Sequence, residues 1–179
     1  MFVLGVDPGL TRCGYGVVAG TEGHERALAA GVVTTAASDP IPLRLAMLRQ
    51  ELQAIIVEYR PDVVVVERVL FQTNARTAMS VGQASGVALL CAAEAGLQVV
   101  EYSSNEVKLA VAGYGAATKR QVQEMVTSLL SLREIPKPPD AADALALALC
   151  HHAHARIASA LERIEGAPVG PRSKSGVAS

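Results

Sequence analysis

Four carboxylates in this chain stand where a fold could bring them to a single point. Asp7 ends the first apolar run, FVLGVDPG, and Glu67 ends a second, DVVVVERV. Asp140 and Asp143 open the last helical segment, and their i, i+3 spacing places both on one helix face. Two unneutralised carboxylates about 4 Å apart would repel by about 4 kcal/mol at an effective dielectric of about 20. Such a cluster indicates divalent cations, and hard oxygen ligands favour magnesium or manganese.

Each acid also has a simpler explanation when it is taken alone. Asp7 could cap its own turn, and its Asp-x-Gly-x-Thr string is also how actin-like and sugar-kinase ATPases begin. Glu67 could be a solvated residue at a strand end. Asp140 and Asp143 would favour the dipole of the helix that they open. However, Asp143 shares a face with the apolar Leu147, so an unpartnered carboxylate there would be costly. The conjunction of the four acids therefore indicates an active site.

The hydrophobic pattern predicts the elements that must position these acids. In chain order we expect strands over 2–7, about 13–19 and about 27–35, a helix over about 41–59, a strand at 63–66, a helix over about 75–95 and a strand at 98–102. Two capping boxes, Ser103-x-x-Glu106 and Thr118-x-x-Gln121, then open two short helices, and a last helix runs from about 140 to 164.

This order of elements, βββαβαβααα, predicts an α/β fold with a five-stranded mixed sheet flanked by helices. The first three strands are joined by short connections and form an antiparallel meander, whereas the run of four valines at 63–66 shows no alternation and predicts a strand buried on both faces. We expect one domain over residues 1–165, because 179 residues would be cramped as two. Residues 166–179 turn to Gly, Pro and Ser and are predicted to be a disordered tail.

Composition narrows the class of protein. Half of the residues are apolar and 18% are charged, as in a compact globular protein. The net charge of −1 argues against nucleic acid as a partner, but without the four acids 16 basic residues face 13 acidic ones, a balance of +3. No apolar stretch reaches the roughly 18 residues that span a bilayer, so no membrane is expected. Three widely spaced cysteines and the absence of a secretory signal pattern predict a cytoplasmic protein with free thiols.

Several motifs together resemble one family, the RuvC-type Holliday junction resolvases of the ribonuclease H-like superfamily. They stand in the order and near the spacing of that family across roughly residues 1–155: GVDPGLTRCGYG, VVVERV with FQTN shortly after, GQASGVAL, EVKLAVAGYGAATKRQVQEMV and DAADALALALCHH. The resemblance implies a ribonuclease H-like fold and a magnesium-dependent crossover junction endodeoxyribonuclease.

The family has four metal-binding acids, and Asp7, Glu67, Asp140 and Asp143 fall on those positions. By this resemblance Asp7 bridges two Mg²⁺ ions, Glu67 binds one of them, and Asp143 with Asp140 binds the other, with Mn²⁺ as a substitute. Some members have His in place of Asp140, which makes it the most substitutable of the four. The implied chemistry is two-metal phosphodiester hydrolysis that leaves 5′-phosphate and 3′-hydroxyl ends.

The resemblance also implies residues that contact DNA. Lys108 and Lys119 match positions that bind the DNA backbone, where such contacts position the substrate without reading its sequence. The family usually carries an aromatic residue three positions after the catalytic Glu, whereas this chain has Leu70 there with Phe71 next to it. Leu70 could act as an aliphatic wedge between bases, or Phe71 could substitute for the aromatic residue. Ser85 stands where family members often have a basic residue.

The function implied by these features is the resolution of four-way (Holliday) DNA junctions in recombination and repair. A nearly two-fold symmetric junction is matched by a homodimer with two active sites, and the helix around Gly82–Leu90 is the predicted dimer face. The family also implies cooperation with the RuvA–RuvB branch-migration complex. The alternatives are an actin-like or sugar-kinase ATP-binding protein, a DNA-binding module that recognises junctions without cutting them, and a DEDD-type transposase.

Three histidines near the middle of the last helix invite a comparison with zinc sites. His151, His152 and His154 follow Cys150, but no second pair of ligands with zinc-finger spacing exists elsewhere in the chain. We therefore predict that the three histidines lie on the surface or at the edge of a groove.

Overall fold

The computed structural model describes residues 1–21, 23–68 and 75–165. The elements in chain order are β1 (Phe2–Asp7), β2 (Arg12–Ala19), β3 (Arg26–Thr34), α1 (Ile41–Tyr59), β4 (Val63–Glu67), α2 (Ala75–Glu94), β5 (Gln98–Tyr102), α3 (Ser104–Ala112), α4 (Lys119–Leu129) and α5 (Pro139–Glu165). The order predicted from the sequence is confirmed, and the predicted bounds agree to within one or two residues. Leu70, Phe71 and the predicted tail 166–179 lie outside the described residues.

Five strands of the described chain form one mixed sheet in the order β3-β2-β1-β4-β5. β1 pairs with β2 and β2 with β3 in antiparallel fashion, whereas β4 lies parallel to both β1 and β5. Because β1 and β4 are parallel neighbours, their carboxyl ends meet at the same edge of the sheet. Asp7 is the last residue of β1 and Glu67 is the last residue of β4, so this pairing brings the two acids to one place.

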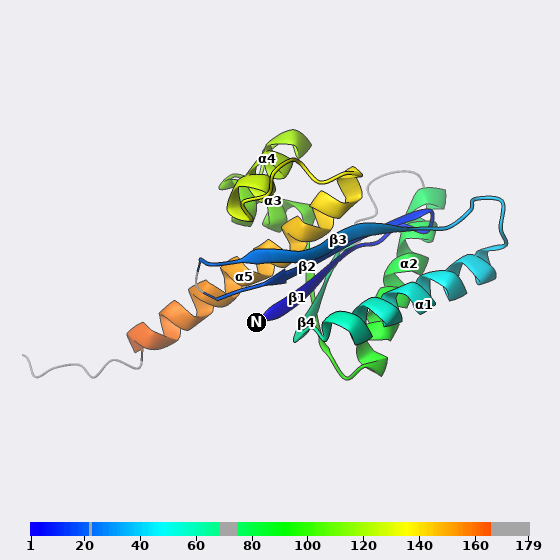
Figure 1. Ribbon diagram of the computed structural model, residues 1–179, viewed down its shortest axis with the longest axis horizontal. Helices are drawn as coiled ribbons and strands as arrows, with labels where there is room; N and C mark the ends of the chain where they lie inside the picture. Colours follow the sequence, from blue (N-terminus) through cyan, green and yellow to red (C-terminus); the bar gives the residue numbers. More distant parts are fainter. Residues whose placement is uncertain (22, 69–74, 166–179) are drawn as a thin grey trace, which may run out of the picture.

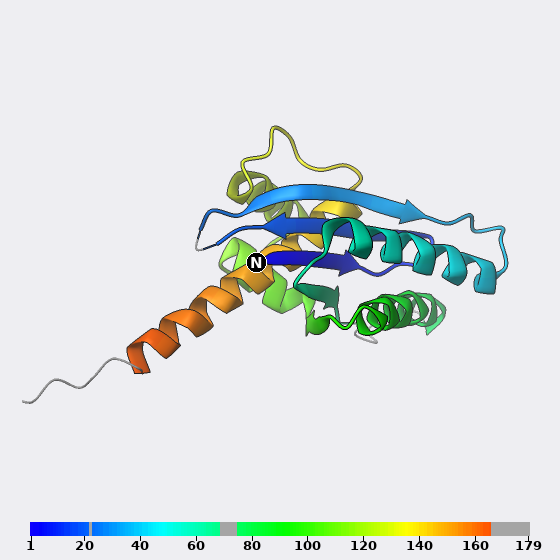
Figure 2. The ribbon, with the colours of Figure 1, turned by 60° about the horizontal axis from the view of Figure 1, so that its bottom comes forward.

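Two apolar layers cover the two faces of the sheet (Figures 1 and 2). α3, α4 and α5 pack on one face, and α1 and α2 pack on the other. The four valines of β4 alternate between these layers: Val63 and Val65 belong to the first, and Val64 and Val66 to the second, all at most 3% exposed. The expectation of a strand buried on both faces is therefore confirmed.

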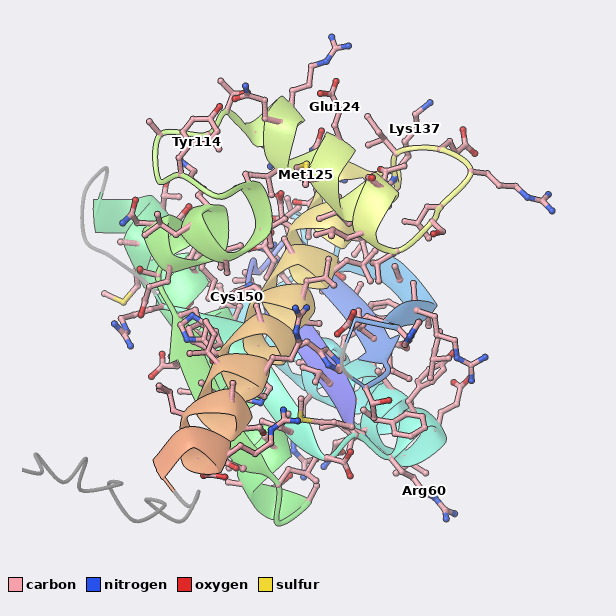
Figure 3. All side chains as sticks on the ribbon, turned by 90° about the vertical axis from the view of Figure 1, so that its left-hand side faces the viewer. Arg60, Tyr114, Glu124, Met125, Lys137 and Cys150 are labelled. Atoms are coloured by element: carbon pink, nitrogen blue, oxygen red, sulfur yellow. The ribbon has the colours of Figure 1, made fainter. Side chains whose placement is uncertain are left out.

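Helix α5 lies directly against the central strands. A Cβ atom added at Gly5 would overlap the carbonyl oxygen of Ala144, and one added at Gly14 would overlap that of Asp140. These glycines therefore allow the backbone of α5 to approach the sheet more closely than any side chain would. Figure 3 shows α5 crossing the molecule with Cys150 near its middle, and with Tyr114, Glu124 and Met125 on the α3–α4 side. The first turn of α5 is thereby held beside β2.

The structure corrects one expectation for the histidines. His152 is only 4% exposed, and its Nε2 lies 3.3 Å from the carbonyl oxygen of Val18. His151 Nδ1 lies 3.1 Å from the hydroxyl oxygen of Tyr102, and the ring of His154 stacks on Tyr102 at 4.8 Å between centroids. His151 and His154 thus share Tyr102 as a partner, whereas His152 faces Val18 of β2. His152 is a core residue because the helix turns it toward β2, not toward solvent.

No helix of the described residues combines the length and the apolar character that crossing a membrane requires. The three cysteines, Cys13, Cys91 and Cys150, are free and buried.

Candidate active site

The acids predicted from the sequence come from three elements and meet at the carboxyl edge of the sheet. Asp7, Glu67 and Asp143 line one cavity of about 430 Å³, and Lys108 from α3 and Lys119 from α4 line the same cavity. The remaining lining residues are Ser104, Val107, Val122, Ala146 and Leu147. Five of the predicted site residues thus share one hollow, and they are separated by up to 136 residues in the chain.

Asp140 lies beside this cavity and does not line it. Its Oδ2 accepts hydrogen bonds from Nε and Nη2 of Arg12, at 3.1 and 2.7 Å. The carboxylate is nevertheless close enough to contribute to the electrostatics of Asp7. Asp140 therefore lies next to the acid cluster, but its carboxylate points to Arg12 and does not line the cavity.

The pKa of Asp7 reflects both the burial of its carboxyl and the negative charge of the neighbouring acids. Burial raises the pKa of this carboxyl from 3.8 to about 7, with further increases from Glu67, Asp143 and Asp140 and a partial offset from Lys119. Burial also raises the pKa of Glu67, with Asp143 adding to the rise, while a hydrogen bond with Asp7 and the charges of Lys119 and Lys108 lower it. Near neutral pH the Asp7 carboxyl, with its pKa of about 7, is therefore about half protonated, because burial disfavours its charged form and Lys119 offsets this only in part.

Lys119 compensates part of this charge. Its Nζ lies 2.6 Å from Oδ2 of Asp143. Burial would lower the pKa of Lys119, but the hydrogen bond with Asp143 and the nearby Asp7 and Asp140 raise it overall. Lys119 is also the first residue of α4, where the helix dipole disfavours a positive charge. The Thr118 capping box fixes the start of this helix. Lys119 therefore faces the acids from a helix position that is unfavourable for a positive charge.

A buried arginine fixes the turn that follows Asp7. Arg44 of α1 is 9% exposed; its Nε donates to Thr35 Oγ1 at 2.9 Å and its Nη2 donates to Thr11 Oγ1 at 2.7 Å. Thr35 Oγ1 in turn donates to the carbonyl oxygen of Leu10 at 2.6 Å. The chain between β1 and β2 is thus tied to α1 by three hydrogen bonds, which restrict the position of the preceding carboxylate.

Sequence reasoning did not find Arg12 or Arg44. Both stand within or near motifs that were recognised, but their partners lie 128 and 33 residues away along the chain. The start of β2, where Arg12 lies, and the first turns of α1, where Arg44 lies, carry no periodicity or spacing that predicts such a partner. Only the approach of α5 and α1 to the β1–β2 turn reveals these contacts.

Comparison with known proteins decides the family. The sequence profile described as "Crossover junction endodeoxyribonuclease RuvC" matches residues 3–151. The chain belongs to the RuvC family. A RuvC protein of Salinispora arenicola is 54% identical over 168 residues, covering 91% of this chain and 96% of the relative. One from Syntrophomonas wolfei is 48% identical over 162 residues, covering 90% and 94%. The resemblance drawn from the motifs is confirmed.

Solved structures agree with this membership. Thermus thermophilus RuvC in complex with a Holliday junction substrate superposes with a TM-score of 0.85 at 39% identity, covering 89% of this chain and 97% of that one. The yeast mitochondrial resolvase Ydc2 superposes with a TM-score of 0.66 at 14% identity, covering 90% and 83%; it supports the fold alone. The ribonuclease H-like fold expected from the sequence is therefore confirmed, with its mixed sheet and flanking helices.

The acids would bind a divalent cation favourably, whereas without one their carboxylates repel each other. All are oxygen donors, as magnesium and manganese prefer, and the raised pKa of Asp7 records negative charge that Lys119 does not neutralise. In the described part of the chain no three Asp, Glu, His or Cys side chains are gathered tightly enough to form a preassembled metal site. Arg12 and Lys119 hold two of the four acids instead. Oxygen donors of the kind that divalent cations prefer are therefore present, and side-chain cations of the protein pair with Asp140 and Asp143.

Competition between protons and metal gives a pH prediction. Below pH 7 the Asp7 carboxyl carries a proton, since burial and its acidic neighbours raise its pKa to about 7. A divalent cation must displace that proton, so affinity should rise about tenfold from pH 6 to pH 8 and level off above. Isothermal titration with Mg²⁺ in DNA-free protein measures this. The Asp7→Asn variant should bind more weakly and with a flatter pH profile; an equally flat profile in the unmodified protein would contradict the assignment.

Proposed function

We propose that this protein is a structure-selective endonuclease that resolves four-way (Holliday) DNA junctions by paired, symmetric nicks in recombination and DNA repair. The observation that carries the proposal is the cavity in which acids from β1, β4 and α5 face two lysines from α3 and α4, in a chain of the RuvC family. A cavity that holds both acids that attract cations and lysines that attract phosphates suits a phosphodiester substrate.

The metal ligands in this proposal are Asp7, Glu67, Asp143 and Asp140. Proteins of this family are divalent-metal-dependent nucleases, and we assign two Mg²⁺ ions to each site, with Mn²⁺ as a substitute. Asp7 shares the cavity with Glu67 and Asp143, and by the family resemblance it is the residue that both ions would share. When bound, such ions supply an activated water and stabilise the leaving oxygen.

The protein itself contributes position and charge to the reaction. β1 and β4 hold Asp7 and Glu67 at strand ends inside a packed sheet, and α5 brings Asp143 against them across the glycines of the central strands. Lys119 and Lys108 stand where they can neutralise the non-bridging oxygens of a phosphate in the cavity. No side chain needs to form a covalent intermediate.

The direct experiment is cleavage of a labelled four-way junction beside a linear duplex of the same sequence, with Mg²⁺, Mn²⁺ or EDTA and without ATP. The proposal predicts metal-dependent, symmetric nicks in the junction alone, with 5′-phosphate ends. Binding without cutting under either metal would favour a recognition module. A requirement for ATP would favour the ATP-binding alternative, which the Asp-x-Gly-x-Thr string of β1 and its turn left open.

Lys119 gives a prediction for the DNA contact. In an Asp7→Asn background, which prevents cleavage, Lys119→Ala should weaken junction binding and reduce the slope of log K against log salt by about 0.9, the value for one phosphate contact. Fluorescence anisotropy at several salt concentrations measures the slope. Arg49→Ala is the matched control, because Arg49 pairs with Glu94 on the opposite face. A slope unchanged by Lys119→Ala would remove this lysine from the phosphate contacts, and Lys108 can be tested in the same way.

The homodimer remains part of the proposal, and α2 offers the face for it. Met79, Gly82, Gly86 and Leu90 recur at helical spacing on this helix, with Met79 66% and Leu90 49% exposed. Nothing lies within 4 Å of a Cβ added at either glycine. A second copy of α2 could therefore approach closely along this stripe, which contains the predicted Gly82–Leu90 segment.

A charged substitution tests this face. Gly86→Arg should raise the dimer dissociation constant at least about a hundredfold, because burying an unpaired charge costs several kcal/mol. Light scattering coupled to size exclusion measures the mass, and Val57→Arg on α1, where Val57 is 72% exposed, is the control. A Gly86→Arg protein that stays dimeric at the same concentrations would exclude α2 as the interface.

Two further assignments rest on the sequence itself: a single nuclease domain over residues 1–165, from the length of the chain, and a cytoplasmic location, from its widely spaced cysteines. Two others rest on the family resemblance: Leu70 or Phe71 opens base pairs near the junction, and RuvA–RuvB is the partner complex.

A further inference from the structure

The contact between Arg12 and Asp140 joins the β1–β2 turn to the first turn of α5. Two guanidinium nitrogens donate to one carboxylate oxygen, Oδ2, at 3.1 and 2.7 Å. The Arg12 side chain is 47% exposed and that of Asp140 is 27% exposed. A pair with two hydrogen bonds directed at one oxygen is better defined than a single contact between flexible side chains. One acid of the proposed ligand set is therefore already occupied by a cation of the protein.

The backbone of Asp140 packs tightly against β2. Its carbonyl oxygen lies so close to Gly14 that a Cβ on that glycine would overlap it. Rotation of the Asp140 side chain therefore requires less rearrangement than a shift of the helix start. A turn toward the cavity that Asp7, Glu67 and Asp143 line takes the carboxylate away from Arg12.

The positive charge of Arg12 also opposes a cation that binds the free oxygen of Asp140. Both oxygens belong to one carboxylate, so an ion on Oδ1 would stand within a few ångströms of the guanidinium, and like charges at that distance repel strongly. Either Arg12 leaves or the ion binds more weakly. Asp7 and Glu67 have no arginine partner among the described residues, so a cation held there is free of this competition.

We propose that Arg12 competes with the second divalent cation for Asp140 and thereby sets the metal concentration at which the complete two-ion site forms. This inference rests on the proposed function, since it concerns the same ligand set. It divides the two ions into a tighter one at Asp7 and Glu67 and a weaker one at Asp143 and Asp140. Arg12 is a positioning residue in this role, because it acts on the metal through Asp140.

Titration of the full-length protein with Mn²⁺ in the absence of DNA tests the proposal. Calorimetry gives the affinities, and electron paramagnetic resonance of free Mn²⁺ counts the bound ions. In Arg12→Gln the weaker ion should bind about three- to fivefold more tightly, the range that the loss of an exposed ion pair allows. The tighter ion should change less than twofold. Equal affinities of both ions in the variant and the unmodified protein, or weaker binding in the variant, would overturn the proposal.

Two further variants separate competition at Asp140 from a general effect of charge. Arg49→Gln removes a pair of similar exposure, 45% and 39%, on the other face of the sheet and should leave both affinities unchanged. In an Asp140→Asn background, Arg12→Gln should have no further effect on the weaker ion. If the gain persists in that background, it comes from charge alone and the proposal is wrong. If the unmodified protein binds no Mn²⁺, the metal assignment of the proposed function fails as well. That result differs from one in which Mn²⁺ binds but Arg12→Gln leaves its affinities unchanged, which overturns only the role of Arg12.

Discussion

Asp7→Asn is expected to bind a four-way junction with nearly unchanged affinity and to leave it uncut. The substitution keeps the shape of the residue but removes a carboxylate that shares the cavity with Glu67 and Asp143. Since metal ions lower such barriers by several kcal/mol, cleavage should fall at least about a thousandfold. Binding should persist because the lysines that line the cavity are intact. Gel-shift and cleavage assays on the same labelled junction measure both.

The same variant is expected to be more stable than the unmodified protein when metal is absent. The folded-state pKa of Asp7 is raised by burial and by its acidic neighbours from 3.8 to about 7. The folded state therefore binds the proton more tightly than the unfolded state, and stability is lost as pH rises from about 4 to about 7. At pH 8 the neutral asparagine should recover about 1–4 kcal/mol of this loss.

Thermal unfolding in EDTA tests this stabilisation. Asp7→Asn should melt several degrees higher than the unmodified protein at pH 8, and the difference should shrink toward pH 5. Mg²⁺ should raise the melting temperature of the unmodified protein more than that of the variant, because ligand binding stabilises the folded state. Asp39→Asn, at an exposed position outside the cavity, is the control. An Asp7→Asn protein that is less stable than the unmodified protein in EDTA would contradict the claim that the charged form of Asp7 destabilises the fold when no metal is bound.

Gly14→Ala is expected to reduce cleavage about a hundredfold through the position of α5. Its Cβ would overlap the carbonyl oxygen of Asp140, so the first turn of α5 must move away from β2. Asp140 and Asp143 both lie in that region, and a misplacement of about 1 Å can cost a factor of about a hundred. Overpacking of this kind also costs about 1–3 kcal/mol of stability. Single-turnover cleavage and chemical denaturation measure the two effects.

Gly82→Ala is the matched control for this glycine. A methyl group at Gly82 meets nothing within 4 Å, and an alanine inside a helix is favoured over glycine by about 0.5–1 kcal/mol. The control should therefore be at least as stable as the unmodified protein and fully active. Full activity of Gly14→Ala would mean that the start of α5 can shift without disturbing the site.

The fold was largely predictable because its local patterns are strong. The valine run of β4 shows no alternation of apolar and polar residues, and a strand that packs between two apolar layers requires none. The capping boxes at Ser103 and Thr118 predicted the starts of α3 and α4, and both are present with side-chain and backbone hydrogen bonds in each direction. Such signals depend on neighbours within a few residues, so the sequence contains all that is needed to interpret them.

The site was predictable only where chemistry and element ends coincide. Asp7 and Glu67 end parallel neighbouring strands, so their meeting follows from the order of the sheet. The ion pair of Arg12 with Asp140 depends on how closely α5 approaches β2, a packing detail that no local pattern carries. The burial of His152 has the same origin, because the rotation of α5 about its axis decides which of three adjacent histidines faces the sheet.

The most direct test of the central claim is to locate manganese by anomalous diffraction in crystals of the protein grown with Mn²⁺. The account predicts two peaks that share Asp7, one also bound by Glu67 and the other by Asp143 and Asp140, with the Arg12 side chain withdrawn from Asp140. Two results would contradict this expectation. One is that the acids are ordered but no peak lies beside them at saturating Mn²⁺. The other is that peaks lie elsewhere while Arg12 stays paired with Asp140 and Lys119 with Asp143.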